Sequence, residues 1–201
     1  MVSAAAMGWT FLALLALERG LELAISGRNA RRMLARGGVE AGRAHYPVMV
    51  AFHAGFLLAC AAEQLLWPAP WPLPAAAAAL ALALAAQALR WWAVATLRGR
   101  WTTRVVVVPG EPPVTDGPYR FVRHPNYLAV VVELLAAPLV LGSWRTALAF
   151  TLGNALVLSA RIPAEERALG PAWREAFRDR PRLLPVRSPR LGPPAAPEER
   201  R

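Results

Sequence analysis

The sequence contains one cysteine, Cys60, and no lysine. A single thiol excludes a disulfide-stabilised secreted module and any zinc or redox centre built from several cysteines. No glycine-x-glycine motif is present, which excludes the glycine-rich nucleotide-binding turn of a soluble Rossmann fold. Charged residues make up only 18% of the chain and hydrophobic residues 56%, and that hydrophobicity excludes a disordered protein. What remains is a folded and unusually apolar chain.

Long apolar runs dominate the sequence. Hydrophobic residues make up 56% of the 201 residues and the mean hydropathy is +0.31, values typical of a membrane protein. The second and third runs are long enough to cross the bilayer as helices, whereas the fourth and fifth, of about 15 residues each, predict a tight helical hairpin. We therefore expect an all-α, polytopic membrane protein with about five transmembrane helices. The runs are 2–25, 48–66, 75–97, 127–141 and 146–160.

The basic residues predict the topology. All 23 are arginines and the net charge is +10. Most of them lie in 26–46, in 98–126 and from Arg161 onward, segments that five helices place on one side of the membrane. Because cytoplasmic loops are rich in positive charge, we expect a multi-pass protein of the cell membrane with its N-terminus outside and its C-terminus in the cytoplasm. Arginines placed between apolar runs suit lipid headgroups, so no nucleic-acid partner is expected.

The C-terminal part of the chain predicts short helices and a tail. We expect one domain over 1–190 and a disordered tail, rich in proline and charge, over 191–201. Pro163 is expected to end the fifth membrane segment and to begin the next helix. In 164–180, Leu169, Trp173 and Phe177 recur every four residues between arginines. This pattern predicts an interfacial helix with its aromatic stripe in the lipid, and the alternative is a helix packed on the bundle.

The stretch 101–127, WTTRVVVVPGEPPVTDGPYRFVRHPNY, is the most informative loop. Its prolines and glycines set several turns. Asn126 predicts the N-cap of a helix beginning at Tyr127, and a helix N-terminus attracts an anionic group. With Tyr119 and His124 nearby, the loop predicts a pocket for a cofactor that has an aromatic part and a carboxylate. The alternative is an interfacial loop whose arginines bind lipid phosphate.

After the predicted hairpin, Arg161 precedes Glu165 and Glu166. Carboxylates are stabilised in the first turn of a helix. Arg161 and Glu165 are either a surface ion pair of little energetic weight or a guanidinium beside the reacting groups with a carboxylate for ribose hydroxyls.

Together these motifs resemble the isoprenylcysteine carboxyl methyltransferase superfamily. GPY at 117–119, RHPNY at 123–127, Arg161 and the pair at 165–166 match its order and spacing. The likeness covers about 105–185. Members are integral-membrane enzymes that use S-adenosyl-L-methionine at a cytoplasmic site, so the resemblance implies that cofactor here, bound by about 101–187. The cofactor contacts that it implies are Val114, Tyr119, His124, Pro125, Asn126, Tyr127 and Glu165.

The front half is similar to a bacterial branch of that superfamily. The similar segments are ELAISGRN at 22–29, HYP at 45–47, His53 and WTT at 101–103. Some members of this branch accompany type III polyketide synthases and O-methylate alkylpyrones or alkylresorcinols. The resemblance implies a lipophilic acceptor of that kind and a polyketide synthase as a partner. It places Arg161 on the acceptor side, where Arg161 or Arg104 would stabilise an anionic acceptor oxygen.

Ionisable side chains inside the apolar runs are further site candidates. His45, Tyr46 and His53 are candidates for orienting the acceptor hydroxyl or removing its proton, with His53 the catalytic one. The alternative is hydrogen bonding between helices, by Glu63 with His53 or by Glu133 with a tyrosine. In the first run, the polar residues 18, 19 and 22 either continue the helix out of the bilayer or face the bundle interior.

The function expected is therefore methyl transfer to a lipophilic acceptor that enters from the membrane lipid. The same superfamily leaves a prenylcysteine carboxylate or a phospholipid amine as alternative acceptors. Membrane sterol reductases share the RHPxY region, so a reductase that uses NADPH is a third possibility. A lipid-handling protein without enzymatic activity is the fourth.

Overall fold

A computed structural model describes residues 4–43, 45–68 and 71–184 of the chain. The tail predicted at 191–201 lies outside the described residues. The predicted all-α class is confirmed, with one very short β-ladder added. The elements in chain order are α1 (Ala4–Ala35), β1 (Val39–Ala41), α2 (His45–Leu66), α3 (Leu73–Thr96), β2 (Val105–Val107), the 3-10 helix η1 (Gly117–Arg120), α4 (Pro125–Val140) and α5 (Trp144–Ala176).

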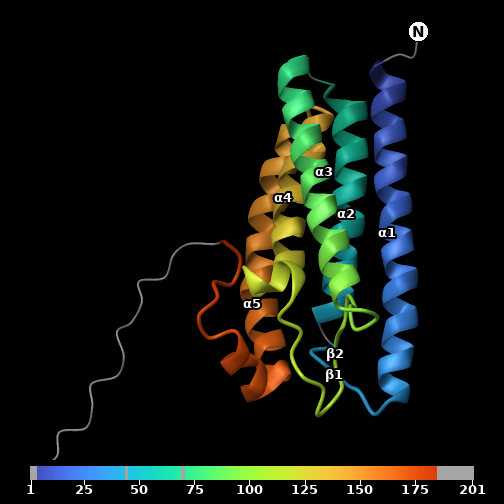
Figure 1. Ribbon diagram of the computed structural model, residues 1–201. Helices are drawn as coiled ribbons and strands as arrows, with labels where there is room; N and C mark the ends of the chain where they lie inside the picture. Colours follow the sequence, from blue (N-terminus) through green and yellow to red (C-terminus); the bar gives the residue numbers. More distant parts are fainter. Residues whose placement is uncertain (1–3, 44, 69–70, 185–201) are drawn as a thin grey trace, which may run out of the picture.

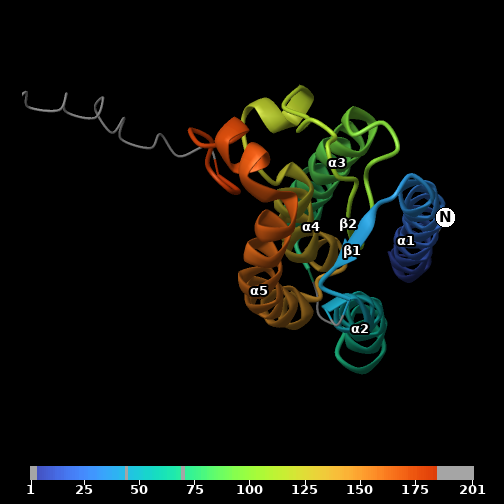
Figure 2. The same cartoon turned by 90° about the horizontal axis from the view of Figure 1, so that it is seen from below.

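The five α-helices lie side by side as an upright bundle (Figure 1). Seen from below, α4 stands between α3 and α5, while α1 and α2 stand on the opposite side (Figure 2). α4 packs most extensively against α3 and then against α5. The bundle therefore has a dense half around α4 and a looser half around α1.

Three helices of the described residues are long and apolar enough to cross a membrane. They are α2 over Tyr46–Leu66, α3 over Leu73–Thr96 and α5 over Trp144–Ala176, and α4 is a shorter apolar helix. The hairpin predicted between the fourth and fifth runs is present, because α4 ends at Val140 and α5 begins at Trp144. α1 carries more charge than these helices, and its charged side chains are taken up below.

The prediction that Pro163 ends the fifth segment is wrong. α5 is 33 residues long and continues through Pro163, although proline has no N–H for the i−4 carbonyl. The helix breaks instead at Gly170, whose φ of 83° is a conformation that glycine adopts without steric cost. The fifth segment was therefore predicted too short, and Arg161 lies inside a continuous helix.

The prediction of a lipid-facing aromatic stripe in 164–180 is also wrong. Trp173 and Phe177 are stacked with their ring centroids 4.7 Å apart, and Phe177 is completely buried. Both pack with Ala93 of α3 and Tyr119 of η1. The stripe faces the bundle, because the break at Gly170 turns the last helical turn back onto α3.

The β-ladder was not predicted. β1 pairs antiparallel with β2, with Val39 opposite Val107 and Ala41 opposite Val105. The ladder joins the segment after α1 to the loop that begins at Trp101, below the bundle (Figure 2). It ties two segments that are distant in sequence into one surface under the helices.

Glu63 fixes the upper end of α5. Its carboxylate accepts hydrogen bonds from the backbone N–H of Arg145 at 3.2 Å and of Thr146 at 2.8 Å, and from the Thr146 hydroxyl at 2.7 Å. The first N–H groups of a helix have no partner within it, so Glu63 satisfies them from α2. The suggested pair of Glu63 with His53 does not form.

Candidate active site

A cavity of about 530 Å³ lies among the five helices and the loop over 101–114. It brings together nine of the residues predicted from the sequence. Two predicted residues, Tyr46 and Pro125, are not in its wall. The side chain of His45, the first residue of α2, lies outside the described residues. The nine residues in the wall are His53, Arg104, Val114, Tyr119, His124, Asn126, Tyr127, Arg161 and Glu165.

Arg161, Tyr127 and Glu165 form the centre of this wall. The Nε–H of Arg161 donates to the Tyr127 hydroxyl oxygen at 2.8 Å, and the Tyr127 hydroxyl donates to Glu165. Arg161 also donates to the backbone carbonyl of Thr103 and is only 5% exposed. The suggestion of a surface ion pair between Arg161 and Glu165 is therefore wrong, since Tyr127 stands between them. The guanidinium is held in one orientation by α4 and the loop.

His124 is held by a carboxylate from α5. Its Nε2 lies 3.2 Å from Oε1 of Glu166, and an ionised carboxylate only accepts, so Nε2 carries the proton. The imidazole ring lies between Tyr127 and Trp173, with centroid distances of 5.4 and 5.5 Å. The Nδ1 atom of His124 lies 4.0 Å from Oε1 of Glu165.

The chain after α5 covers this part of the site. The backbone N–H groups of Arg123 and His124 donate to the carbonyls of Pro181 and Arg182, at 2.9 and 3.0 Å. Arg182 donates two hydrogen bonds to Glu166, at 3.0 and 2.7 Å. These hydrogen bonds raise the pKa of the Arg182 guanidinium. The segment over 178–182 thus binds the RHPNY loop through its backbone.

Asn126 does not cap α4 as predicted. The helix begins at Pro125 and His124 is the N-cap residue, because proline is favoured at the first helical position. Asn126 lies in the first turn and lines the cavity. Its Oδ1 is buried and has no hydrogen-bond partner among the described residues. Such an atom is costly unless a ligand pairs with it.

Tyr119 borders the cavity from η1. Burial, and then the nearby Glu165 carboxylate, raise the pKa of its phenol, so the side chain is a neutral hydrogen-bond donor. η1 packs closely on α3: a Cβ on Gly117, whose φ is +54°, would clash with the Thr96 side chain and lie 3.1 Å from Nε1 of Trp92. Glycine at 117 therefore allows Tyr119 to approach the bundle.

The predicted acceptor-side residues lie at two different depths. The Arg104 guanidinium lies 4.6 Å from the centroid of the Tyr46 ring and 3.5 Å from Glu40, and its side chain is 42% exposed. Arg104 is therefore at the loop side of the cavity. His53 lies within α2, where its Nδ1 is 2.9 Å from the carbonyl oxygen of Met49. Because a carbonyl only accepts, Nδ1 carries the proton and Nε2 is an acceptor.

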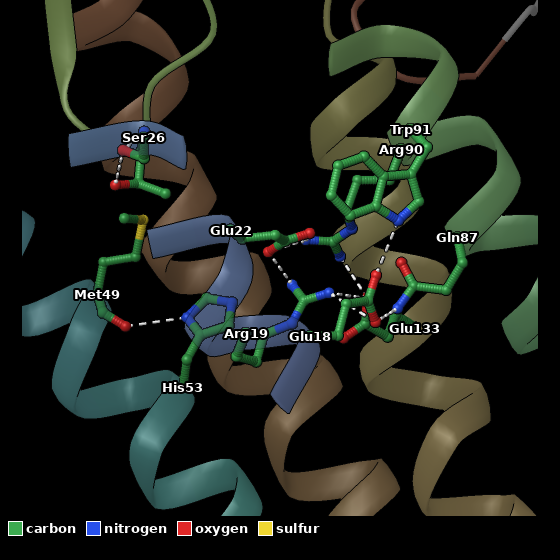
Figure 3. A network of polar contacts seen from close by, with 11 residues as sticks. Glu18, Arg19, Glu22, Ser26, Met49, His53, Gln87, Arg90, Trp91 and Glu133 are labelled. Atoms are coloured by element: carbon green, nitrogen blue, oxygen red, sulfur yellow. Dashed lines mark hydrogen bonds and ion pairs between the residues drawn. The ribbon is translucent and has the colours of Figure 1, made fainter. Parts of the chain in front are cut away.

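A cluster of buried charges at the depth of His53 joins α1, α3 and α4 (Figure 3). Glu22 contacts Arg19 at 2.6 Å and Arg90 at 3.2 Å, and Arg90 also pairs with Glu133. Glu22, Arg90 and Glu133 are each less than a tenth exposed. We call Glu18, Arg19, Glu22, Arg90 and Glu133 the membrane-depth cluster.

Two other side chains complete this cluster. Gln87 and Trp91 of α3 both donate to Glu18, the latter at 3.1 Å. Of the two possibilities for the first run, the polar face is turned into the bundle. Glu133 pairs with Arg90 rather than with a tyrosine. Arg90 was missed, and an arginine inside an otherwise apolar third run was the signal that could have identified it.

Comparison with known proteins agrees with this geometry. Residues 79–171 match the isoprenylcysteine carboxyl methyltransferase (ICMT) family. A Bacillus subtilis (strain 168) protein named "Uncharacterized protein YpbQ" is 38% identical over 166 residues, covering 81% of this chain and 96% of the relative. The chain belongs to the ICMT family. A Haemophilus influenzae relative (strain ATCC 51907 / DSM 11121 / KW20 / Rd), named "Uncharacterized protein", is 27% identical over 161 residues, covering 80% of this chain and 92% of the relative.

ICMT membership carries a general activity to this chain. Together with the apolar helices, it supports a membrane-bound methyltransferase. The matched range includes η1, the RHPNY loop, Arg161 and the pair at 165–166. The residues that form the centre of the cavity wall thus belong to the part of the chain that defines the family.

Proposed function

We propose that this protein is an S-adenosyl-L-methionine-dependent methyltransferase that O-methylates a lipophilic acceptor. The observation that supports the proposal most is the cavity itself. One continuous space is lined by the polar Tyr127, Arg161 and Glu165 on the loop side and by apolar side chains of α1 and α2 at membrane depth. A water-soluble cofactor and an alkyl-chain acceptor can meet in such a space.

The residues present fit the cofactor. Glu165 offers acceptor oxygens for its ribose hydroxyls or ammonium group, and Tyr119 offers an aromatic face with a neutral hydroxyl. The buried and unpartnered Oδ1 of Asn126 is an acceptor that a bound ligand can satisfy. When bound, S-adenosylmethionine supplies a methyl group on a positively charged sulfur, which leaves as a neutral thioether once an acceptor oxygen has taken the methyl group.

The lipid side of the cavity suits an alkyl chain. Leu23 of α1 and Val50 of α2 line the cavity, and their side chains are 44% and 37% exposed. We propose that an acceptor reaches the cavity beside these two side chains without leaving the bilayer. Each methylene group of the acceptor's alkyl chain that is buried contributes about 0.8 kcal/mol to the free energy of binding.

Two groups of this chain are suited to handle the acceptor's hydroxyl proton and charge. His53 presents Nε2 as an acceptor in the cavity wall, so it can take up the proton. Arg161 is fixed by Tyr127 and by the Thr103 carbonyl and can stabilise a developing oxyanion without rearranging. An acidic enol needs little further help from a base, because it loses its proton more readily than an ordinary phenol does.

The acceptors proposed first are alkylpyrones and alkylresorcinols, with a polyketide synthase as the partner that supplies them. These compounds combine an acidic hydroxyl group with an alkyl chain.

The protein is proposed to lie with its N-terminus outside and its C-terminus in the cytoplasm. This orientation puts the cofactor side of the cavity in contact with the cytoplasm.

The test is calorimetric titration of the detergent-purified full chain with S-adenosylhomocysteine. We expect saturable binding, at least tenfold weaker in Asn126→Leu and unchanged in Glu175→Gln, a variant of a surface carboxylate that is 70% exposed. Titration with NADPH should give no signal. Saturable binding of NADPH without binding of S-adenosylhomocysteine would contradict the proposal and favour a reductase.

A further inference from the structure

The cavity extends past the Arg161–Tyr127 pair into the membrane-depth cluster. Arg19, Glu22 and Arg90 line it together with His53. Figure 3 shows the His53 ring on α2 directed toward Arg19 and Glu22 on α1. The part of the cavity at this depth therefore carries charged and polar groups beside apolar ones such as Leu57 and Val130, although an alkyl chain needs no polar group there.

Several polar atoms of this wall have no hydrogen-bond partner among the described residues. They include Nε of Arg19 and Nε of Arg90. On α5, Asn154 also lines the cavity, is only 2% exposed and has an unpartnered Nδ2. A buried polar group without a partner costs about 1–3 kcal/mol. A wall that only held the helices together would not need these unpaired groups beside a cavity.

These groups share one depth. Glu133 lies six residues above Tyr127 on α4, and Asn154 lies seven residues before Arg161 on the antiparallel α5. At 1.5 Å per residue, both lie about 10 Å from the Tyr127–Arg161 pair along the bundle. This separation of about 10 Å, between the Tyr127–Arg161 pair and the level of Glu133 and Asn154, can hold a six-membered ring with an oxygen substituent on each side. Each oxygen would then make a hydrogen bond of about 2.8 Å.

The charges of the cluster select the kind of group that can bind. Three carboxyl groups, Glu18, Glu22 and Glu133, face the two guanidinium groups of Arg19 and Arg90. The guanidinium groups are thus already outnumbered, and an acceptor carboxylate brought to this depth would be repelled. A neutral hydroxyl group can donate to a carboxylate and accept from an amide or guanidinium N–H.

We propose that Glu22, Arg19 and Asn154 form a second polar subsite that binds another oxygen substituent of the acceptor's ring, away from the oxygen that is methylated. The inference rests on the proposed function and makes it more specific. The acceptor is then a ring with two oxygen substituents and an alkyl chain. Prenylcysteine carboxylates do not meet this requirement.

The test compares two probes of equal chain length, an alkylresorcinol and the alkylphenol that lacks one hydroxyl group. Their Kd values are measured by calorimetry on the full chain saturated with S-adenosylhomocysteine. We expect the alkylresorcinol to bind about 10- to 100-fold more tightly, as a hydrogen bond to a charged group gives. In Glu22→Gln the ratio of the two Kd values should fall below about threefold. In Glu175→Gln this ratio should equal that of the unaltered protein.

Equal Kd values in the unaltered protein would overturn the subsite, as would an unchanged ratio in Glu22→Gln. If Glu22→Gln fails to fold, Asn154→Leu replaces it, and the comparison in the unaltered protein decides without any variant. Failure of the proposed function shows itself separately, because S-adenosylhomocysteine then does not bind. The two probes are in that case compared on the full chain alone, and the difference between their Kd values still tests the subsite.

Discussion

The hydroxyl group of Tyr127 accepts a hydrogen bond from Arg161 at 2.8 Å while it donates one to Glu165. One side chain of α4 therefore sets the positions of two side chains of α5. A guanidinium and a carboxylate that would otherwise pair directly are kept apart. Under the proposed function, this separation puts Glu165 on the cofactor side of the cavity and Arg161 on the acceptor side.

Tyr127→Phe removes only that hydroxyl group. Arg161 then loses a buried partner and can pair with Glu165 instead. We expect the affinity for S-adenosylhomocysteine to fall about tenfold, since a hydrogen bond to a charged group contributes about 1.5–3 kcal/mol. Titration calorimetry measures this, and an unchanged Kd would contradict a bridging role for Tyr127.

Arg182→Gln tests the segment that covers the RHPNY loop. The substitution removes the two hydrogen bonds to Glu166 and should loosen the backbone pairing of 181–182 with Arg123 and His124. We expect amide hydrogen exchange at Arg123 and His124 to become about tenfold faster. Arg174 also lies in the C-terminal part, and among the described residues it takes no part in this pairing. In the control variant Arg174→Gln, exchange at Arg123 and His124 should not change.

Glu63→Ala removes the side chain that caps α5 from α2. Three hydrogen bonds to one buried carboxylate are lost, and a lost cap costs about 0.5–2 kcal/mol. We expect a clearly lower Tm in detergent with unchanged binding of S-adenosylhomocysteine, because the cap at Thr146 lies about 22 Å along α5 from Arg161. Glu63→Gln keeps one acceptor oxygen and should lose less. A Tm equal to that of the unaltered protein would rule out the capping role.

Asn154→Leu separates stability from function. Replacing a buried amide that has an unpartnered Nδ2 with an apolar side chain of similar size removes an unpaired polar group from the bundle interior. We expect the Tm to rise, by an amount that corresponds to about 1 kcal/mol, while acceptor binding weakens. A fall in Tm together with unchanged acceptor binding would show that Asn154 has a structural role only.

The sequence was sufficient to predict the helical class and the residues around the cavity's centre. Apolar runs locate helices wherever the helix is uniformly apolar, as in α2 and α3. They fail at the ends of α1 and α5, which continue as helices after the apolar run stops. Arg161 ended the fifth run in the sequence, yet it is buried in α5 because Tyr127 and the Thr103 carbonyl pair with it.

Other features depend on contacts that no local pattern contains. Gly170 rather than Pro163 breaks α5, because a proline within a packed helix loses one hydrogen bond whereas a residue at φ 83° cannot continue the helix at all. The partners of Glu133 and Glu63 came from helices distant in sequence. The ladder of β1 with β2 had a local signal, four consecutive valines at 105–108, but its partner strand did not.

Under the proposed function, the cavity meets water at the loop over 101–114 and lipid beside Leu23 and Val50, which line it. The two substrates would then arrive from different phases, one from water and one from lipid, and neither would have to pass the other. No compulsory binding order follows from such a geometry. The reaction rate should then depend on the mole fraction of the acceptor in the bilayer and not on its bulk concentration, so that adding inert lipid slows the enzyme while its saturation with cofactor stays the same.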